Sequence, residues 1–412
     1  MQIEQGIFQV ITCNMSKRKN LLTEEVRMFL DLTEEQKLIQ DTARDFAKAE
    51  LEPVAAALDQ SDDRSALLVN LKKLSELGFM GLNVRSEYGG SDAGVISFSL
   101  AITEIARACA STAVTVSVSN MVAEVIQAVG SEEQRKAYIP KICSGEYSAG
   151  GFALTETCAG SDPAGMCAQA IDDGDSWVLN GSKIFITSAT YAGVFVAWAV
   201  TDKAAPKGKG ISCFLVEAGT PGLVVGKEEK KMGQHASATN EVIFDSCRIP
   251  KSALMGKLND GFRIAAGELA GGRIGIGSLG LGVGLAAMDY ATRYVTERVQ
   301  FGQKVSNFQA IQWMIADAYT ELEAARLLLM SAAYRKESGK TFAKEASMAK
   351  MFATEAGNQA CYKAIQMLGG YGYTQDFPVE RYARDARITS IYEGTNEIQR
   401  MIISREILRN FS

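Results

Sequence analysis

The sequence contains only one histidine, His235, among its 412 residues. A single imidazole cannot form a cluster of histidine metal ligands. A Ser-His-Asp triad is disfavoured as well, because no G-x-S-x-G segment is present to carry the serine. His235 lies in the segment KMGQHASATNE, which is typical of a loop. We therefore expect a hydrogen-bonded or solvent-facing imidazole at this position.

The eight cysteines include no C-x-x-C pair, so the sequence gives little support to a zinc site, and we expect no bound metal. Scattered cysteines in a chain of this length, without a secretory signal, suggest reduced thiols in a cytosol-like compartment. Long basic runs are missing too, and the formal net charge is −5, which disfavours a nucleic-acid partner. No apolar run reaches the roughly 18 residues of a membrane span, so we expect no membrane partner.

Residues 1–27 match no class of targeting peptide. GIFQVITC is a short apolar stretch that follows an acidic residue and precedes no small-residue cleavage site. MSKRKN is basic but lacks the arginine-rich amphipathic face of a transit peptide. We expect residues 1–27 to form a poorly ordered extension, or to reflect an upstream start codon ahead of Met28.

The remaining chain divides into three stretches that predict an α+β fold. Residues 28–150 favour an N-terminal α-helical domain, in which Thr33 and Gln36 have the spacing of a capping box. Pro53 should end or restart the first helix, and EYGGSDAG at 87–94 is typical of a loop. Residues 151–260 favour a middle antiparallel β-barrel or sandwich domain. Residues 261–412 favour a C-terminal four-helix-bundle domain.

Two glycine motifs need their context to be interpreted. Asn180-Gly181 stands between apolar β-formers, which is the strongest short-range signal for a hairpin turn. Gly275, Gly277 and Gly280 match G-x-G-x-x-G, but no strand precedes them and both flanks favour helix. Gly280 and Gly284 more simply allow two helices to approach closely.

Two further segments could carry chemistry. ALTETCAGSDP, residues 153–163, gathers hydroxyl groups and glycines where the helical stretch gives way to strands. It could cradle a polar heterocycle or a phosphate-bearing chain, or it could be a capping loop. In IYEGTNEIQR, residues 391–400, Glu393 could be a solvated surface charge or a base held in a pocket.

Five motifs occur in an order that resembles the acyl-CoA dehydrogenase family. They are ALTETCAGSD, WVLNGSKIFITSA, GRIGIG, ERVQFGQ and QMLGGYGYTQDFPVERYARDARITSIYEGTNEIQR. The resemblance spans about residues 30–411 and is strongest to the short-chain, butyryl-type branch. It implies a flavoprotein of fatty acid metabolism that uses FAD to convert an acyl-CoA to the 2-enoyl-CoA.

The resemblance also implies roles for individual residues. Glu393 matches the base that removes the α-proton of the thioester, while the β-hydrogen leaves as hydride to flavin N5. One branch of the family carries its base immediately before an arginine of the GR dipeptide. That position is Gly272 here, ahead of Arg273, and it cannot act as a base.

The positions that match family contacts to FAD are Phe152, Leu154, Thr155, Gly160, Ser161, Phe185, Ile186, Thr187, Arg298, Phe301, Gln309, Gln366, Gly369, Gly370, Thr395 and Glu397. Thr155 and Thr187 would hydrogen-bond the flavin ring, and Phe185 stands where many relatives have tryptophan. Arg298, like the pair Gly369 and Gly370, would reach FAD bound to a neighbouring subunit. Glu397 should lie nearer ribose hydroxyls than the diphosphate.

The positions that match substrate contacts are Ser161, Thr103, Arg273, Tyr392 and Gly394. Relatives that act on glutaryl-CoA have an arginine where this chain has Thr103, so a second carboxylate would be left unpaired. Asp92 replaces a usually small residue. It belongs to a loop, or, if it enters the pocket, it favours an unusual acyl group such as a cyclic one.

The resemblance further implies an electron-transfer flavoprotein as acceptor and a homotetramer built as a dimer of dimers. The location would be cytoplasmic in a bacterium and the mitochondrial matrix in a eukaryote. Three alternatives stay open: a dehydrogenase of a cyclic or branched acyl-CoA, an acyl-CoA oxidase, and a non-catalytic flavoprotein scaffold.

Overall fold

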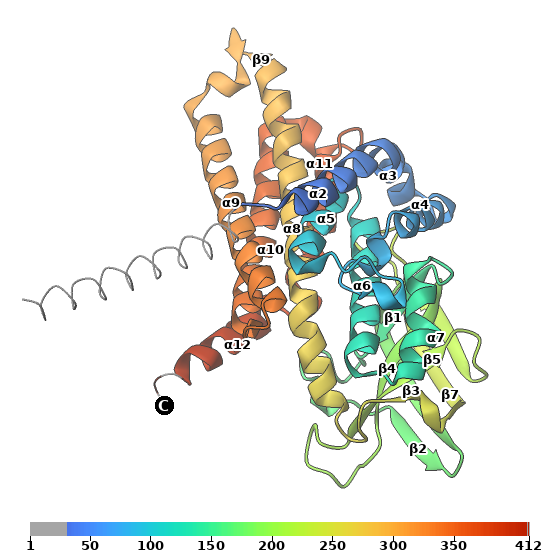
Figure 1. Cartoon of the computed structure of the whole chain (residues 1–412). Helices are drawn as coiled ribbons and strands as arrows, with labels where there is room; N and C mark the ends of the chain where they lie inside the picture. The colour runs from blue at the N-terminus through green and yellow to red at the C-terminus, as the bar shows by residue number, and fades with distance from the viewer. Residues whose placement is uncertain (1–30, 410, 412) are drawn as a thin grey trace, which may run out of the picture.

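The computed structural model describes residues 31–409 and residue 411, so the expectation for residues 1–27 lies outside the described residues. Helices occupy both ends of this part of the chain and strands its middle, which confirms the α+β fold (Figure 1). The chain changes from helix to strand between Cys143 and Ala149, and back again between Met255 and Gly261. The domain limits expected from the sequence stay predictions.

The N-terminal helices are α2 (Glu34–Phe46), α3 (Glu52–Gln60), α4 (Ser65–Glu76), α5 (Gly94–Ala108), α6 (Ala110–Val129) and α7 (Glu132–Cys143). The capping box at α2 is confirmed, because the Gln36 N–H donates to Thr33 Oγ1 at 3.1 Å and the Thr33 N–H donates to Gln36 Oε1 at 3.0 Å. A π-helical turn, Ala47–Leu51, joins α2 to α3, and Pro53 lies in the first turn of α3. Proline is tolerated there because the N–H groups of a first turn have no partner within the helix.

The middle part is a mixed sheet of eight strands. They are β1 (Ala149–Ala153), β2 (Gln169–Asp173), β3 (Ser176–Thr187), β4 (Ala192–Val200), β5 (Ile211–Glu217), β6 (Leu223–Glu228), β7 (Thr239–Pro250) and β8 (Leu254–Met255). The order is β6-β7-β3-β2-β4-β5-β8, with β1 paired to β4. Most pairs are antiparallel as expected, but β1 runs parallel to β4. The segment between them is long enough for the crossover that a parallel pair requires.

The hairpin expected at Asn180-Gly181 is wrong. Strand β3 continues through both residues, and the turn lies at residues 174–175, where Asp173 pairs with Ser176. At Gly181 the register against β7 shifts, which marks a β-bulge. A Cβ on Gly181 would lie 2.7 Å from the Cα of Ala168. Glycine is needed here for close backbone approach and not for a turn.

The C-terminal part contains α8 (Gly261–Glu297), the short strands β9 (Val299–Gln300) and β10 (Gln303–Lys304), α9 (Gln309–Glu337), α10 (Ala343–Leu368), α11 (Val379–Arg387) and α12 (Asn396–Leu408). The G-x-G-x-x-G match lies buried inside α8 with no strand before it, so the helix-packing interpretation is confirmed. A Cβ on Gly280 would lie 3.2 Å from the Cα of Thr354 in α10, and a Cβ on Gly284 only 2.8 Å from the Cα of Gly357.

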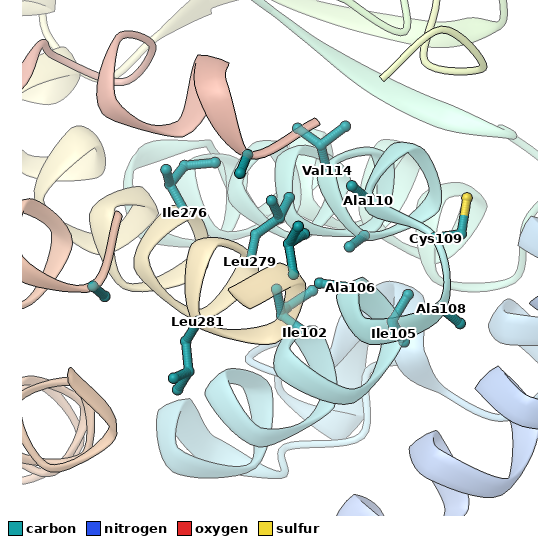
Figure 2. Close-up of a cluster of buried hydrophobic side chains, with 14 of the residues drawn as sticks. Ile102, Ile105, Ala106, Ala108, Cys109, Ala110, Val114, Ile276, Leu279 and Leu281 are labelled. Carbon is teal, nitrogen blue, oxygen red and sulfur yellow. The ribbon is translucent and has the colours of Figure 1, made fainter. Parts of the chain in front are cut away.

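The main core joins the N-terminal and C-terminal helices. Figure 2 shows Ile102 and Ile105 of α5, Val114 of α6, and Ile276 and Leu279 of α8 pointing into one cluster, and each is at most 1% exposed. This cluster fixes α8 against the N-terminal domain. The position of the buried middle of α8 is therefore set by packing against the N-terminal helices on one side and α10 on the other.

Two described helices, α6 and α8, are long and apolar enough to span a membrane, contrary to the expectation that no run would reach that length. In each, 78% of the most apolar window is buried inside the protein. Their hydropathy is explained by burial between other helices of the chain.

We predict that Gly357→Ala lowers the free energy of unfolding by about 1–3 kcal/mol, because the added Cβ would meet the carbonyl oxygen of Gly280 at 2.2 Å. Gly267→Ala is the matched control, since nothing lies within 4 Å of its added Cβ on α8. That change should stabilise the protein by about 0.5–1 kcal/mol through helix propensity. Urea unfolding of both variants measures the difference, and equal stabilities would contradict the close approach of α8 and α10.

Candidate active site

The centre of the site is a turn between α11 and α12 that contains Glu393. Glu393 has φ 53° and Gly394 has φ 90°, so two consecutive residues adopt left-handed backbone. Glycine adopts this conformation freely, whereas for glutamate it costs free energy and must be held by its surroundings. Thr395 then caps α12, because its Oγ1 accepts the N–H of Ile398 at 3.4 Å.

Two side chains from different helices hold this turn through one carbonyl group. Lys350 Nζ of α10 and Gln399 Nε2 of α12 donate to the Gly394 oxygen at 2.9 and 2.8 Å. Lys350 also donates to Asn396 Oδ1 at 3.0 Å. Lys350 is fully buried, so both acceptors satisfy a charge that has no access to water.

The Glu393 side chain turns back toward α8. Its Oε2 is buried and has no hydrogen-bond partner among the described residues. A Cβ placed on Gly272 would lie 2.3 Å from Oε2 and 2.7 Å from the Sδ of Met121. The carboxylate tip therefore lies directly over Gly272, in space that exists only because this residue has no side chain.

The surroundings of Glu393 bring the pKa of its carboxyl group close to neutral pH. Burial raises the pKa of Glu393 to about 7, and the nearby Lys350 and Arg273 oppose that rise. Burial lowers the pKa of Lys350 to about 7 and that of Arg273 to about 10, while Glu393 opposes both changes. A carboxylate with this pKa can accept a proton at neutral pH and release it again.

A loop of the β-domain supports the turn from the other side. The Gln234 side chain donates from Nε2 to the Tyr392 hydroxyl at 3.3 Å and to the Asp385 carbonyl at 3.1 Å, and its N–H donates to Asp385 Oδ1. Burial raises the pKa of Asp385 to about 6. Gln234 was not predicted from the sequence, and it links the β-domain directly to the residue before Glu393.

The same loop brings the predicted flavin contacts to the site. The Ser188 N–H donates to the Ala238 oxygen at 2.7 Å, which ties the end of β3 to the loop that carries Gln234. The Ile184 N–H donates to the Thr155 oxygen at 2.8 Å, which ties β3 to the segment after β1. These hydrogen bonds connect the segments that carry Thr155, Phe185, Ile186 and Thr187 to the loop of Gln234, which in turn contacts Tyr392 beside Glu393.

This region has the features that a flat, polar ring system requires. The Phe185 ring is 61% exposed, and its φ of 59° is left-handed. Ser188 Oγ and Gln399 Oε1 are buried polar atoms without a partner in the described chain. Gly160 has open space where a Cβ would be, and Ser161 is exposed beside it. An exposed aromatic residue and buried polar atoms without partners are features that the isoalloxazine of FAD, which stacks and also forms hydrogen bonds, would use.

The predicted cofactor residues fall into two groups. One surrounds the turn and β3, and its further members are Phe152, Leu154, Thr395 and Glu397. The Phe152 ring lies 4.4 Å from that of Trp198, Leu154 is buried, and Glu397 is exposed in the first turn of α12. The other group lies far away, near the C-terminal end of α8.

The distant group is exposed to solvent and lies beside the short strands β9 and β10 (Figure 1). Its members are Arg298, Phe301, Gln309, Gln366, Gly369 and Gly370. The Arg298 guanidinium lies 5.7 Å from the Tyr371 ring centre. Arg298 directly follows α8 and comes 25 residues after Arg273, which is roughly 37 Å along the helix. The chain therefore does not bring the two groups together around one flavin ring.

The remaining predicted positions differ in their surroundings. Thr103 is buried and donates to the Ser99 oxygen at 2.8 Å. Its carbonyl faces Gly282, about 15 Å along α8 from Gly272. Asp92 is exposed in its loop, which agrees with the loop interpretation. His235 has carbonyl oxygens of Asp59 and Lys231 at 2.8 Å from its two ring nitrogens, so the expected hydrogen-bonded imidazole is confirmed.

Models of the acyl-CoA dehydrogenase N-terminal, middle and C-terminal domains match residues 33–146, 151–247 and 259–408. The chain belongs to the acyl-CoA dehydrogenase family. A relative named Acryloyl-CoA reductase (NADH), from Anaerotignum propionicum, is 43% identical over 386 residues, which are 93% of this chain and 97% of the relative.

Two other relatives extend this comparison. The human protein named Short-chain specific acyl-CoA dehydrogenase, mitochondrial, is 44% identical over 383 residues, which are 93% of this chain and 92% of the human protein. A chain in the solved structure described as "Electron transferring flavoprotein of Acidaminococcus fermentans: Towards a mechanism of flavin-based electron bifurcation" is 43% identical with a TM-score of 0.89. That match covers 92% of this chain and 99% of the other.

We predict that Lys350→Met raises the pKa of Glu393, because the buried cation favours the ionised carboxylate. The pH at which an acyl-CoA reduces the bound flavin at half its maximal rate should move upward by roughly one unit. Lys363→Met is the matched control on the same helix, where Lys363 pairs with Glu321 at 3.0 Å. If the pH dependence of flavin reduction is unchanged in Lys350→Met while FAD is still bound, this role for Lys350 is contradicted.

Proposed function

We propose that the protein catalyses α,β-dehydrogenation of a short, uncharged acyl-CoA, with Glu393 as the base that removes the α-proton. The observation that carries this proposal is the buried, unpartnered Glu393 Oε2 beside Gly272. A thioester α-C–H is only weakly acidic, so its base must be close, oriented and shielded from water. A carboxyl group whose pKa is about 7 meets the electrostatic part of that requirement.

FAD is the cofactor of this family. When bound, it supplies the electron acceptor that takes the β-hydrogen as hydride. Thr155, Phe185 and Thr187 would hold the ring on the side opposite Glu393, with Ser161 at its edge. Arg298, Gly369 and Gly370 would hold the diphosphate end of FAD bound to another copy of the chain, because Arg298 follows Arg273 by 25 residues, roughly 37 Å along α8.

The turn offers a second catalytic group besides the carboxylate. The Glu393 N–H forms no hydrogen bond within the described residues. It is available to donate to the thioester oxygen, where negative charge develops as the α-proton leaves. Lys350 and Gln399 restrain the backbone that carries this N–H, because both bind the Gly394 carbonyl two peptide units further along the turn. Arg273 adds positive charge close to the carboxylate.

The substrate class follows from the absence of a matching charge near Thr103. The Thr103 hydroxyl is already used in the hydrogen bond to Ser99 and cannot pair with a second carboxylate of the acyl chain. A dicarboxylyl group would leave an unpaired charge in a buried site, which is costly. The human relative's name, short-chain specific, supports a short acyl group.

The reverse reaction is a second candidate, favoured by the relative named Acryloyl-CoA reductase (NADH). A carboxyl group with a pKa of about 7 is half protonated near neutral pH, so Glu393 could also deliver a proton to the α-carbon of an enoyl-CoA. Comparing the rates of butyryl-CoA oxidation and crotonyl-CoA reduction by one preparation separates the two directions. A preparation that reduces crotonyl-CoA but leaves its flavin oxidised with butyryl-CoA would contradict the dehydrogenase direction.

We also infer the partners and the location from the relatives. The Acidaminococcus fermentans structure supports an electron-transfer flavoprotein as the acceptor of electrons. The exposed rings of Phe301 and Tyr373, 93% and 87% exposed, support a contact with further copies of the chain in a homotetramer. Relatives occur in bacteria and in mitochondria, which supports the cytoplasm or the mitochondrial matrix according to the host. Sedimentation of the holoprotein and assay with an electron-transfer flavoprotein test the first two inferences.

We predict that Glu393→Gln keeps FAD and ligand binding but slows flavin reduction by butyryl-CoA by about 10²–10⁴-fold, the usual contribution of a general base. Anaerobic bleaching of the flavin absorbance measures the rate. Glu406→Gln is the control, since Glu406 pairs with Arg409 on α12, and this variant should bleach like wild type. Bleaching by Glu393→Gln at the wild-type rate would refute the assignment.

We predict that Arg298→Ala weakens FAD retention, because a guanidinium binds a diphosphate through two parallel hydrogen bonds. FAD remaining after gel filtration is the measurement. Arg293→Ala is the control, since Arg293 is exposed in the last turns of α8, five residues before Arg298. A fully loaded Arg298→Ala variant would argue against the cofactor site shared between subunits.

A further inference from the structure

Two cysteines lie side by side at the edge of the cofactor region. The Sγ atoms of Cys158 and Cys167 are 3.5 Å apart. Both residues are exposed, whereas the other five cysteines of the described chain are buried. Cys167 also lines a surface cavity of about 320 Å³. This pair is therefore the accessible thiol site of the described residues, and a small reagent can reach it.

A buried anchor holds both cysteines in place. Glu156 Oε2 accepts the Cys167 N–H at 2.6 Å, and Oε1 accepts the Ala168 N–H at 3.0 Å. Lys183, fully buried on β3, donates to the same Oε1 at 2.7 Å. Glu156 also pairs its backbone with Ala159, so Cys158 lies within a closed turn. The two sulfur atoms thus meet because their backbones are tied to one carboxylate.

The arrangement does not suit a metal ion. Glu156, Cys158 and Cys167 place three potential ligand atoms within 4.8 Å of one another. Both carboxylate oxygens, however, already accept hydrogen bonds from Lys183 or from backbone N–H groups. Only the two sulfur atoms remain, and a structural zinc site needs four ligands.

The two sulfur atoms differ in their surroundings. The hydrogen bond with Cys167 raises the pKa of the Cys158 thiol, and partial burial and the charges of Cys167 and Glu156 act in the same direction. Cys158 therefore keeps its proton and donates it toward Cys167. Of the two, only Cys167 lines the surface cavity, so it is the sulfur that a small oxidant reaches first, with Cys158 aligned to complete a second step.

We propose that Cys158 and Cys167 are a reversible redox pair that forms a disulfide when the protein meets a peroxide. The Cys167 thiolate attacks the peroxide O–O bond and becomes a sulfenic acid, with one water released after protonation. The Cys158 sulfur then displaces the sulfenic oxygen as a second water, and the S–S bond forms. Two thiols are oxidised and one hydrogen peroxide is reduced to two waters. A dithiol reductant reverses the change.

Closure of this bond would act on the segment between the two cysteines. That segment carries Gly160 and Ser161, which the proposed function places beside FAD. A disulfide removes much of the freedom of a short loop between its ends. We therefore expect the oxidised protein to release FAD more slowly than the reduced protein. This consequence rests on the proposed function, whereas the formation of the disulfide does not.

The test treats the FAD-loaded Cys13→Ser protein with one equivalent of hydrogen peroxide and then digests it without reductant. Cys13 lies outside the described residues, and its removal prevents confusion with disulfides between chains. Cleavage before Asp162 separates Cys158 from Cys167, so the proposal expects two peptides that stay joined until dithiothreitol is added. Two free thiols per chain should be lost and then recovered. Peptides that separate without reductant would overturn the proposal.

Single variants test the order of the steps. In Cys158→Ser, oxidation should stop at the Cys167 sulfenic acid, which dimedone labels. Cys167→Ser should be labelled by dimedone much less. Equal labelling of both variants would overturn the assigned roles. FAD release is then compared between the oxidised and reduced protein, with Cys158→Ser/Cys167→Ser as the control that peroxide should not affect. If the disulfide forms without slowing FAD release, the redox pair is supported and its link to the cofactor site is refuted.

Discussion

The site depends on one carbonyl group, that of Gly394, which two buried donors hold in place. Lys350 approaches it from α10 and Gln399 from α12. Without them nothing in the local sequence would keep two consecutive residues in left-handed backbone, because a glutamate disfavours that conformation. With them, the side chain of Glu393 points inward over α8, and its N–H is free. A strained backbone is thus maintained by the helices that pack around it, which is the usual origin of strain at a functional site.

The absence of a side chain at Gly272 is the second constraint on the same carboxylate. A Cβ there would overlap with Glu393 Oε2, so the two positions compete for one volume. A family branch with its base at the position of Gly272 would bring a carboxylate into that volume from α8 instead of from the turn. The residue before Arg273 must therefore be small when the turn carries the base. In this chain the glycine and the glutamate form one structural unit, although 120 residues separate them.

Sequence patterns predicted most of the fold because its elements are locally encoded. The capping box at Thr33 follows from neighbouring residues of one helix, and the flanks of the α8 glycines already favour helix over a dinucleotide-binding turn. Asn180-Gly181 was wrongly predicted as a turn because the need for glycine comes from Ala168, just before the neighbouring strand β2, and the residue pattern of β3 does not reveal that contact. The roles of Lys350 and Gln234 could not be predicted either, because both residues act on segments that are distant in the sequence. The only local sign was a lone lysine on the apolar face of α10, and its partner lies 44 residues further on.

The shifted pKa values at the turn lower the stability of the fold and at the same time suit Glu393 to act as a base. Burial raises the pKa of Glu393 from its ordinary 4.5 to about 7, so the folded protein binds a proton there that the unfolded chain has released. Stability therefore falls as the pH rises from about 4.5 to 7. The pKa of Lys350 is lowered from 10.5 to about 7, so stability rises again between pH 7 and 10.5. The two side chains together therefore stabilise the fold least near neutral pH.

The stability lost at neutral pH, at most about 3 kcal/mol for Glu393 alone, is the cost of the site. In return, the carboxylate exchanges a proton readily at the pH where the chemistry takes place. If Glu393 and Lys350 were fully solvated, with their ordinary pKa values, the fold would be more stable. The carboxylate would then be too weak a base for the reaction.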